Sequence, residues 1–234
     1  METRYAFAKR FCHDYLASGP PKLHLRVSEE ALLQEQARRG YPPDYCECVC
    51  LCRALAQELV FWDAFLLHAA VVALDGEAYA FCAPSGVGKS TQAFLWERVF
   101  APRATILNGD KPILRYHDGI LYAYGTPWCG KEGRQRNMCA PLKAICFLER
   151  AAGRADALYP APQEQLPAML LRQVLRPEDS RHADRLFALM DRMLSDVPCF
   201  TLICSAGEAA VTTAYAGIND FYGRNEKSSG GPSS

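Results

Sequence analysis

A short run of glycine, lysine and hydroxyl residues constrains the fold of this chain more than any other feature. The run reads Ala-Pro-Ser-Gly-Val-Gly-Lys-Ser-Thr and spans residues 83–91. Upstream, residues 77–83 alternate in polarity and end in small side chains, which predicts a buried strand that enters a tight loop. Downstream, residues 91–98 are good helix formers. The loop is therefore expected at a helix N-terminus, where free N–H groups and the helix dipole favour an anion.

Each residue type in this run suits the binding of a polyphosphate. Gly86 and Gly88 allow the backbone to curl, so that successive amides point at phosphate oxygens. Lys89 has the length to reach the β and γ phosphates, and the Ser90 hydroxyl suits Mg²⁺. The predicted nucleotide-binding residues of the loop are Ser85, Gly86, Val87, Gly88, Lys89, Ser90 and Thr91.

One position departs from the usual pattern G-x-x-x-x-G-K-[ST]. The first glycine is replaced by Ala83, and alanine fits there if its φ is negative. The alternative interpretation is a glycine-rich turn with a surface lysine. Agreement between the spacing, the predicted strand and the predicted helix favours the phosphate-binding loop.

The composition is that of an ordinary globular protein. The chain has 234 residues, of which 50% are hydrophobic, and a formal net charge of zero. That length allows one substantial core with a small appendage. No charge clustering indicates a nucleic-acid partner, the first ten residues lack the apolar core of a signal peptide, and no apolar stretch is long enough to span a membrane. We therefore expect a cytoplasmic protein without membrane or nucleic-acid partners.

Eleven cysteines are an unusually high count for such a chain. Four of them are Cys46, Cys48, Cys50 and Cys52, in a segment at 44–59 that lacks turn residues and that we interpret as a helix. On a helix they form two pairs that point in different directions. Structural zinc sites use paired elements, and no second pair follows. We interpret the cysteines as packed free thiols, with a metal or redox role as the alternative.

The chain divides into three predicted parts. Residues 1–60 are expected to form a small α+β appendage, with a strand or two near the start and a helix over 29–39. Residues 61–217 are expected to form the core domain. The polar residues 218–234 are expected to be a disordered tail.

Within the core domain, predicted hairpins and helices surround the loop. A turn at 75–76 joins the strand that enters the loop to the strand before it. Further strands are expected at 103–107, 112–116, 120–124, 143–148 and 199–204, and helices at 163–175 and 182–197. The strand at 143–148 is nearly all apolar and is expected to be central. This mixture predicts an α/β fold with a mixed sheet.

A carboxylate is expected beside the loop. Asp110 lies in Asn-Gly-Asp-Lys, directly after the strand at 103–107. Open α/β sheets bind ligands at such strand ends. Asp110 is therefore the candidate metal ligand or general base of a phosphoryl transfer. The alternative is a turn aspartate, because Asn-Gly-Asp is common turn chemistry.

Cations and one histidine complete the candidate site. Lys131, Arg134 and Arg136 lie in a glycine-rich segment at 124–137 and suit the transferring phosphate oxygens, unless the segment is a plain surface loop. His68 begins the strand paired with the one that enters the loop. It has either a role near the phosphates or that of a satisfied core histidine.

Three segments together resemble the catalytic domain of HPr kinase/phosphorylase and, more widely, the phosphoenolpyruvate carboxykinase-like P-loop fold. They are residues 67–91, Asn-Gly-Asp-Lys-Pro at 108–112, and Tyr-Gly-Thr-Pro-Trp-Cys-Gly-Lys at 124–131. The closer similarity is to short bacterial HPr kinase-related proteins, a group that includes kinases of lasso-peptide precursors. The resemblance covers residues 61–206.

The resemblance implies roles for several residues. Lys89 and Ser90 would bind the triphosphate and Mg²⁺, Asp110 would supply the metal or base carboxylate, and His68 would match the histidine that precedes the loop. HPr kinase carries two adjacent acids where this chain has Gly109 and Asp110, so reverse phosphorylase activity is not implied. Counterparts of the HPr kinase N-terminal domain and C-terminal signature are lacking, and HPr itself is not implied as the acceptor.

These observations predict a Mg²⁺-dependent ATP kinase that transfers the γ-phosphoryl group to a hydroxyl, chiefly that of a serine, in a peptide, protein or small molecule. The alternative function is a regulatory nucleotide-binding module that hydrolyses slowly or not at all. The acceptor, the choice of ATP over GTP and the oligomeric state, a homo-oligomer included, stay open. The residues with predicted roles outside the loop amides are Lys89, Asp110, Lys131 and His68 in catalysis, Arg134 and Arg136 at the nucleotide, Ser90 and Asp110 at the metal, and Glu132 as a second acid.

Overall fold

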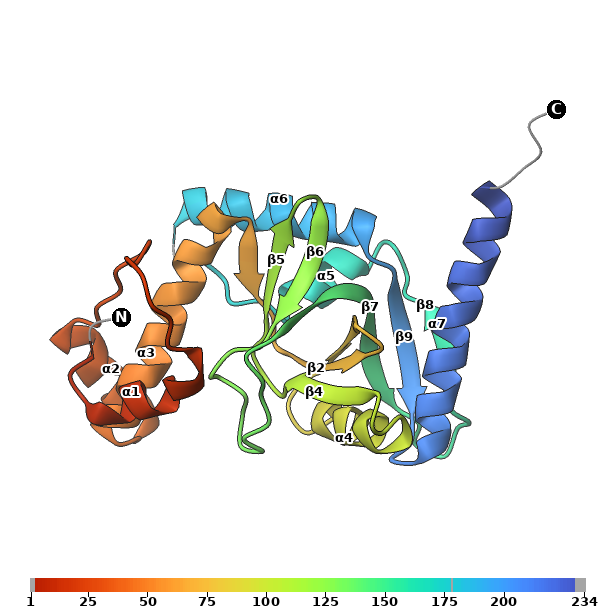
Figure 1. Cartoon of the computed structure of the whole chain (residues 1–234), viewed down its shortest axis with the longest axis horizontal. Coiled ribbons are helices and arrows are strands. Elements are labelled where there is room, and N and C mark those ends of the chain that lie inside the picture. Colours follow the sequence, from red (N-terminus) through yellow and green to blue (C-terminus); the bar gives the residue numbers. More distant parts are fainter. Residues whose placement is uncertain (1–2, 178, 230–234) are drawn as a thin grey trace.

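The computed structural model describes residues 3–177 and 179–229. A curled mixed sheet stands at its centre, with helices on both faces, and the first helices gather at one end, far from the last helix (Figure 1). The predicted α/β fold with a mixed sheet is confirmed. Among the described residues, no helix is long and apolar enough to cross a bilayer.

The N-terminal part is helical, and the strand or two expected near its start are not found among residues 3–60. It consists of α1 (Ala6–Phe11), the 3₁₀ turn η1 (His13–Tyr15), α2 (Glu29–Arg39) and α3 (Pro43–Leu59). The apolar residues Leu25 and Val27 pack against the helices in a small cluster of their own, so they need no sheet to become buried. The predicted α+β character of this appendage is therefore wrong.

Local signals set the bounds of α2. The Ser28 hydroxyl accepts a hydrogen bond from the Ala31 N–H at 3.1 Å, which is the standard N-cap interaction. Gly40 ends the helix in the left-handed region with a φ of 66°, where a residue without Cβ is favoured. The predicted helix over 29–39 is confirmed residue for residue.

The four clustered cysteines lie on α3, as predicted, and all four are buried. Burial raises the pKa of the Cys48 and Cys52 thiols to about 12 each, so both stay protonated at neutral pH. Among the described residues, no group of three or more His, Cys, Asp or Glu side chains is placed to hold a metal ion. The burial and the raised pKa values of these thiols agree with packing as small apolar groups.

The sheet contains nine strands. They are β1 (Ala64–Leu66), β2 (Ala69–Leu74), β3 (Glu77–Cys82), β4 (Ala104–Asn108), β5 (Ile113–His117), β6 (Ile120–Tyr124), β7 (Cys139–Arg150), β8 (Ala157–Pro160) and β9 (Cys199–Cys204). Their main path runs β1-β5-β6-β7-β3-β2-β4, and β9 pairs with both β7 and β8. The pairs β3–β7 and β7–β9 are parallel and the others antiparallel.

Strand β7 holds the sheet together, which confirms the central position expected for 143–148. Residues 139–141 pair with β6, residues 142–147 with β3, and residues 145–150 with β9. One long strand thus changes partners along its length, and this exchange accompanies the curl of the sheet (Figure 1). The arrangement brings the carboxyl ends of β3, β7 and β9 to one edge.

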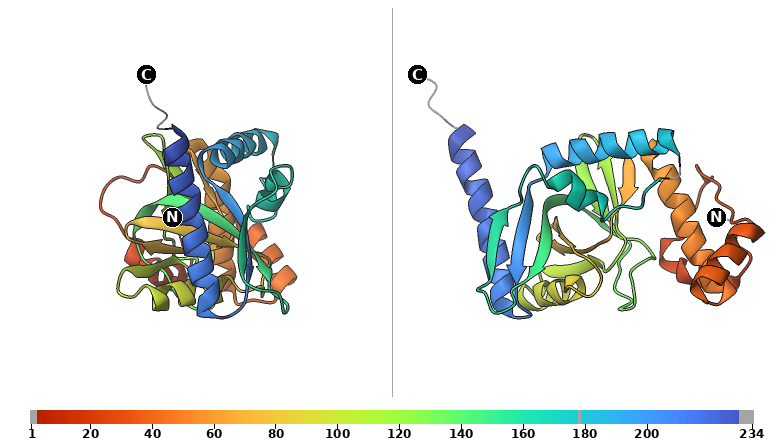
Figure 2. Two further views of the ribbon diagram at one scale, coloured as in Figure 1. Left: turned by 90° about the vertical axis from the view of Figure 1, so that its right-hand side faces the viewer. Right: turned by 180° about the vertical axis from the view of Figure 1, so that it is seen from behind.

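Two apolar layers cover the sheet. Alternate residues of β2 face opposite sides: Val71 belongs to the cluster under α5 (Leu166–Leu171) and α6 (Ser180–Asp196), whereas Val72 belongs to the cluster under α4 (Lys89–Val99) and α7 (Glu208–Ser229). This is the period of two that a strand buried on both faces requires. Figure 2 shows α7 standing along β8 and β9.

The predicted disorder of the tail is wrong for residues 218–229, because α7 continues to Ser229. Ile218 is fully buried and Phe221 packs against Phe200. The Tyr222 hydroxyl donates to the Lys143 carbonyl at 2.7 Å. A few apolar residues on one side of a polar segment are enough to dock it. Residues 230–234 of the predicted tail lie outside the described residues.

Replacing Trp96 by alanine is expected to lower the free energy of unfolding by about 3–5 kcal/mol. The Trp96 ring is fully buried and lies 4.9 Å from the Tyr79 ring and 5.3 Å from the Phe81 ring, between α4 and the sheet. Its buried Nε1 has no hydrogen-bond partner, so Trp96→Phe removes an unsatisfied donor and should cost much less. Chemical denaturation of both variants tests this, and equal losses would contradict it.

Candidate functional site

The loop from Ala83 to Gly88 joins β3 to α4, as predicted. Strand β3 ends at Cys82 and α4 begins at Lys89. Gly86 and Gly88 have φ values of 82° and 137°, which side chains with a Cβ rarely adopt. Ala83 has no such positive φ, so alanine is compatible with the first position. The N-terminal amides of α4 therefore face the loop.

Lys89 is buried and folded back over the loop. Its Nζ donates to the Ala83 carbonyl at 2.8 Å, and only 8% of the residue is exposed. Burial lowers the pKa of Lys89, and the nearby Asp110 carboxylate opposes this by favouring the charged form. The residue is thus a cation removed from bulk water, with an anion within electrostatic reach.

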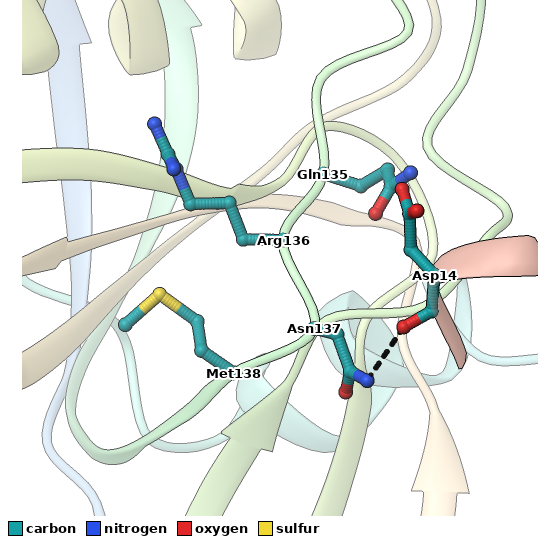
Figure 3. Close-up of a pocket in the computed structure, with 5 residues that line it drawn as sticks. All are labelled: Asp14, Gln135, Arg136, Asn137 and Met138. Atoms are coloured by element: carbon teal, nitrogen blue, oxygen red, sulfur yellow. Dashed lines mark hydrogen bonds between the residues drawn. The ribbon is translucent and has the colours of Figure 1, made fainter. Parts of the chain in front are cut away.

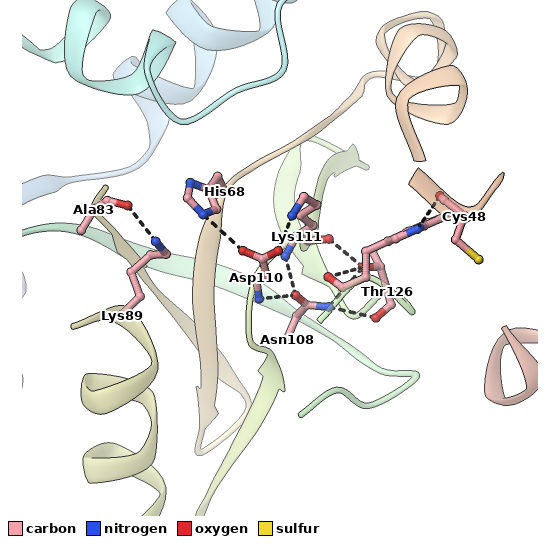
Figure 4. Close-up of polar contacts among 9 residues, drawn as sticks. Cys48, His68, Ala83, Lys89, Asn108, Asp110, Lys111 and Thr126 are labelled. Atoms are coloured by element: carbon pink, nitrogen blue, oxygen red, sulfur yellow. Dashed lines mark hydrogen bonds and ion pairs between the residues drawn. The ribbon is translucent and has the colours of Figure 1, made fainter. Parts of the chain in front are cut away.

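Asp110 is the centre of a compact polar group (Figure 4). Its Oδ1 lies 3.2 Å from His68 Nε2, and its Oδ2 forms an ion pair with Lys111. Burial raises the pKa of Asp110, but the hydrogen bonds and charges of His68 and Lys111 outweigh it and bring the pKa to about 2. Asp110 is therefore ionised at neutral pH.

Main-chain contacts place His68 and Asp110 beside each other. The Ala69 N–H donates to the Asp110 carbonyl at 3.0 Å, and the His68 N–H donates to the Gln173 carbonyl at 2.7 Å. The start of β2 therefore lies against the turn that follows β4. The structure brings together Lys89, Asp110 and His68 of the predicted catalytic residues, and it adds Lys111, to which no role was predicted.

Asn108 organises the turn that carries Asp110. It is fully buried, and its Oδ1 accepts from the Asp110 and Lys111 N–H groups at 2.9 and 2.8 Å. Its Nδ2 donates to the Thr126 carbonyl at 2.9 Å. This is the turn chemistry that Asn-Gly-Asp predicts. The turn and the functional interpretations are therefore compatible, because the turn holds the Asp110 carboxylate beside His68.

The segment at 125–137 wraps around this turn and ties it to the helical part. The Gly109 N–H donates to the Arg134 carbonyl at 3.0 Å, and Trp128 Nε1 donates to the Cys48 carbonyl at 3.0 Å. A Cβ on Gly109 would lie 2.7 Å from the Cys129 carbonyl oxygen, so the backbone leaves no room for a side chain there. An acidic side chain at position 109 would therefore require the backbone to shift.

Replacing Gly109 by alanine is expected to lower the free energy of unfolding by about 1–3 kcal/mol, because overpacking against fixed backbone displaces the turn. Gly223→Ala is the matched control, since a Cβ there meets nothing within 4 Å and its φ is not in the left-handed region. Alanine in that helix is expected to raise stability slightly. Thermal unfolding of both variants tests this prediction. A Gly109→Ala protein as stable as the wild type would show that a Cβ at position 109 does not clash with the backbone.

The three predicted phosphate-clamping cations have different surroundings. Arg134 is turned toward α4, 3.5 Å from Glu97 Oε2 and 5.1 Å above the Phe94 ring. Lys131 is exposed, as is the neighbouring Glu132. Arg136 lines an open cavity of about 480 Å³ with Asp14, Gln135, Asn137 and Met138, and its side chain points away from Asp14 (Figure 3). The contacts of Arg134 and Arg136 are therefore with groups other than Asp110 and Lys89.

Sequence reasoning missed one arginine at the loop. Arg150, the last residue of β7, donates from Nη2 to the Gly86 carbonyl at 2.5 Å. The signal available was its place at the carboxyl end of a strand expected to be central. The parallel pairing of β7 with β3, which the sequence pattern leaves open, is what brings Arg150 to the loop.

Comparisons with known proteins give a distant structural likeness. No protein-family model matches the chain. No curated protein matches it either. Among solved structures, it is similar to the HPr(Ser) kinase/phosphatase from Coxiella burnetii, at 10% identity, over 69% of this chain and 96% of that chain, with a TM-score of 0.38. This likeness is too remote to transfer a site or an activity.

Proposed function

We propose that this protein is a Mg²⁺-dependent ATP kinase that transfers the γ-phosphoryl group to a hydroxyl, chiefly that of a serine, in a peptide, a protein or a small molecule. One observation carries the proposal. A buried loop lysine, Lys89, and an ionised carboxylate, Asp110, lie within electrostatic reach of each other at the sheet edge where β3 and β4 end. Phosphoryl transfer needs this pairing of a phosphate cradle with an acid.

The loop is suited to hold the phosphates. Amides at the start of α4 and the positive end of its dipole would face the phosphate oxygens. Lys89 would leave the Ala83 carbonyl and add a full positive charge. Because Lys89 is mostly buried, water screens that charge weakly, and its attraction for a polyanion is correspondingly strong.

The residues beside the loop fit Mg²⁺. This ion prefers oxygen ligands and commonly takes one or two carboxylates together with substrate phosphates and water. Ser90 and Asp110 offer a hydroxyl and a carboxylate of that kind. When bound, Mg²⁺ would neutralise the charge that develops on the transferred phosphoryl group.

Asp110 would also orient the acceptor. A carboxylate with a pKa of about 2 is a weak base, so it would accept a hydrogen bond from the hydroxyl and take up the proton only as the new bond forms. His68 would keep the carboxylate in position through its 3.2 Å contact. Lys131, Arg134 and Arg136 are proposed to approach the phosphates on nucleotide binding and to neutralise charge there.

Labelled ATP tests the proposal directly. The protein, γ-labelled ATP and Mg²⁺ are incubated with serine-containing peptides, protein acceptors and small hydroxyl compounds, and label is followed into each acceptor. Transfer to a hydroxyl supports the kinase. ATP binding without transfer to any acceptor would instead support a regulatory module, and calorimetry that detects neither ATP nor GTP uptake would overturn nucleotide binding itself.

A further inference from the structure

Arg150 contacts the loop directly, and the proposed function assigns it no role. It ends β7, where its Cα is paired with that of Cys204 at the end of β9. Its Nη2 donates to the Gly86 carbonyl at 2.5 Å, and the residue is exposed. A side chain that contacts the loop while it remains open to solvent is free to turn toward a ligand bound there.

Arg150 and Asp110 lie on opposite sides of the loop. Strand β3, which enters the loop, is paired with β2 on one side and with β7 on the other, and β4 lies beyond β2. Asp110 follows β4, and its carbonyl accepts from Ala69 at the start of β2. The acid therefore stands on the β2 side of the loop and the arginine on the β7 side.

A nucleoside triphosphate has its transferable phosphate at one end and its nucleoside at the other. With the γ-phosphate beside Asp110, as in the proposed function on which this inference rests, the phosphates cross the loop amides toward β7. We propose that the nucleoside end lies over the carboxyl ends of β7 and β9, and that Arg150 is its main side-chain contact. Ligands of open α/β sheets lie at this kind of edge.

The chemistry of the β7 side suits a nucleoside. A guanidinium is planar and stacks on the faces of aromatic rings, and a nucleobase offers such a face. Arg154 donates to the carbonyls of Arg150 and Ala151, both at 3.2 Å, and so holds the turn that presents Arg150.

The neighbouring turn after β9 is held by a carboxylate. Ser205 donates from its N–H and its hydroxyl to Asp156, at 2.5 and 3.0 Å. The Asp156 oxygens keep further lone pairs for ribose hydroxyls. A base stacked on Arg150 would bring its ribose near this turn, because Arg150 and Cys204 are paired and Ser205 follows directly.

Two ligands that differ only in the nucleoside test the assignment. Calorimetry with Mg²⁺ compares ATP with inorganic tripolyphosphate, for wild type and Arg150→Ala. Loss of the stacked guanidinium is expected to raise the Kd for ATP about tenfold. The Kd for tripolyphosphate is expected to change by less than about twofold. Arg185→Ala is the matched control, because Arg185 is exposed and lies on α6, on the face of the sheet opposite α4. This substitution should change neither the Kd for ATP nor the Kd for tripolyphosphate.

The outcomes separate this inference from the proposed function. Equal weakening of both ligands in Arg150→Ala would assign Arg150 to holding the loop through Gly86, and an unchanged Kd for ATP would remove it from the site. Either result overturns the nucleoside assignment while nucleotide binding by the wild type stands. Failure of the wild type to bind ATP would overturn both.

Discussion

Replacing Lys89 by methionine is expected to raise the Kd for Mg²⁺-ATP by about 30-fold or more, since removal of one partner from a buried charge pair costs about 2–5 kcal/mol or more. Lys89 is mostly buried and its Nζ is placed at the mouth of the loop, so its charge would act on the phosphates with little screening. Methionine keeps the length and the apolar stem. Calorimetry with ATP measures the effect.

A thermal unfolding measurement of Lys89→Met is the control, because it shows whether the variant still folds. The Lys89 side chain donates from Nζ to the Ala83 carbonyl, and burial disfavours its charged form. The thermal midpoint should therefore stay close to that of the wild type. A folded variant that binds ATP as tightly as the wild type would show that the loop lysine does not hold phosphates.

Replacing Asp110 by asparagine is expected to lower the rate of phosphoryl transfer by about 10²–10⁴-fold, the range for loss of a general base, while ATP still binds. Asparagine keeps the shape but cannot take up the acceptor proton. Transfer of label from γ-labelled ATP measures the rate, and calorimetry measures binding. Asp118→Asn is the matched control, because Asp118 is an exposed turn residue with a positive φ that asparagine tolerates.

The pH dependence of stability gives Asp110→Asn a second readout. The native pKa of about 2 lies below the value of about 3.9 in an unfolded chain. The ionised carboxylate therefore stabilises the fold above pH 4, and this contribution is lost as the pH falls toward 2. The difference in the free energy of unfolding between wild type and Asp110→Asn should become smaller as the pH falls from about 4 to about 2.

The rate measurement has its own contradicting outcome. An Asp110→Asn protein that transfers phosphoryl groups at the wild-type rate would show that Asp110 takes no part in the transfer.

Several elements followed from local sequence because their causes are local. The Asp75–Gly76 turn joins β2 to β3 with φ values of 51° and 84°, which is the geometry that such a pair favours. Ser28 and Gly40 set the ends of α2. The spacing of Gly86, Gly88 and Lys89 placed a loop between a strand and a helix, and β3 and α4 confirm that placement.

Other elements were missed because their stability comes from distant partners. Strand β1 exists through its pairing with β5, and β8 through its pairing with β9. Residues 218–229, the second half of helix α7, were predicted to be disordered because their average composition is polar, while their docking depends on a few apolar side chains that meet the sheet. Short or polar segments carry too weak a local pattern to reveal such partners.

The candidate site divides in the same way. By itself, the sequence determined a glycine-rich loop between a strand and a helix, the place of Lys89 at its end and the strand-end position of Asp110, since a few adjacent residues specify each through backbone geometry and turn chemistry. Only the tertiary structure decided that His68 meets Asp110, that Gly109 has no room for a side chain, and that Arg150 reaches Gly86. These contacts depend on which strands lie side by side, and that order is set by packing between residues far apart in the chain.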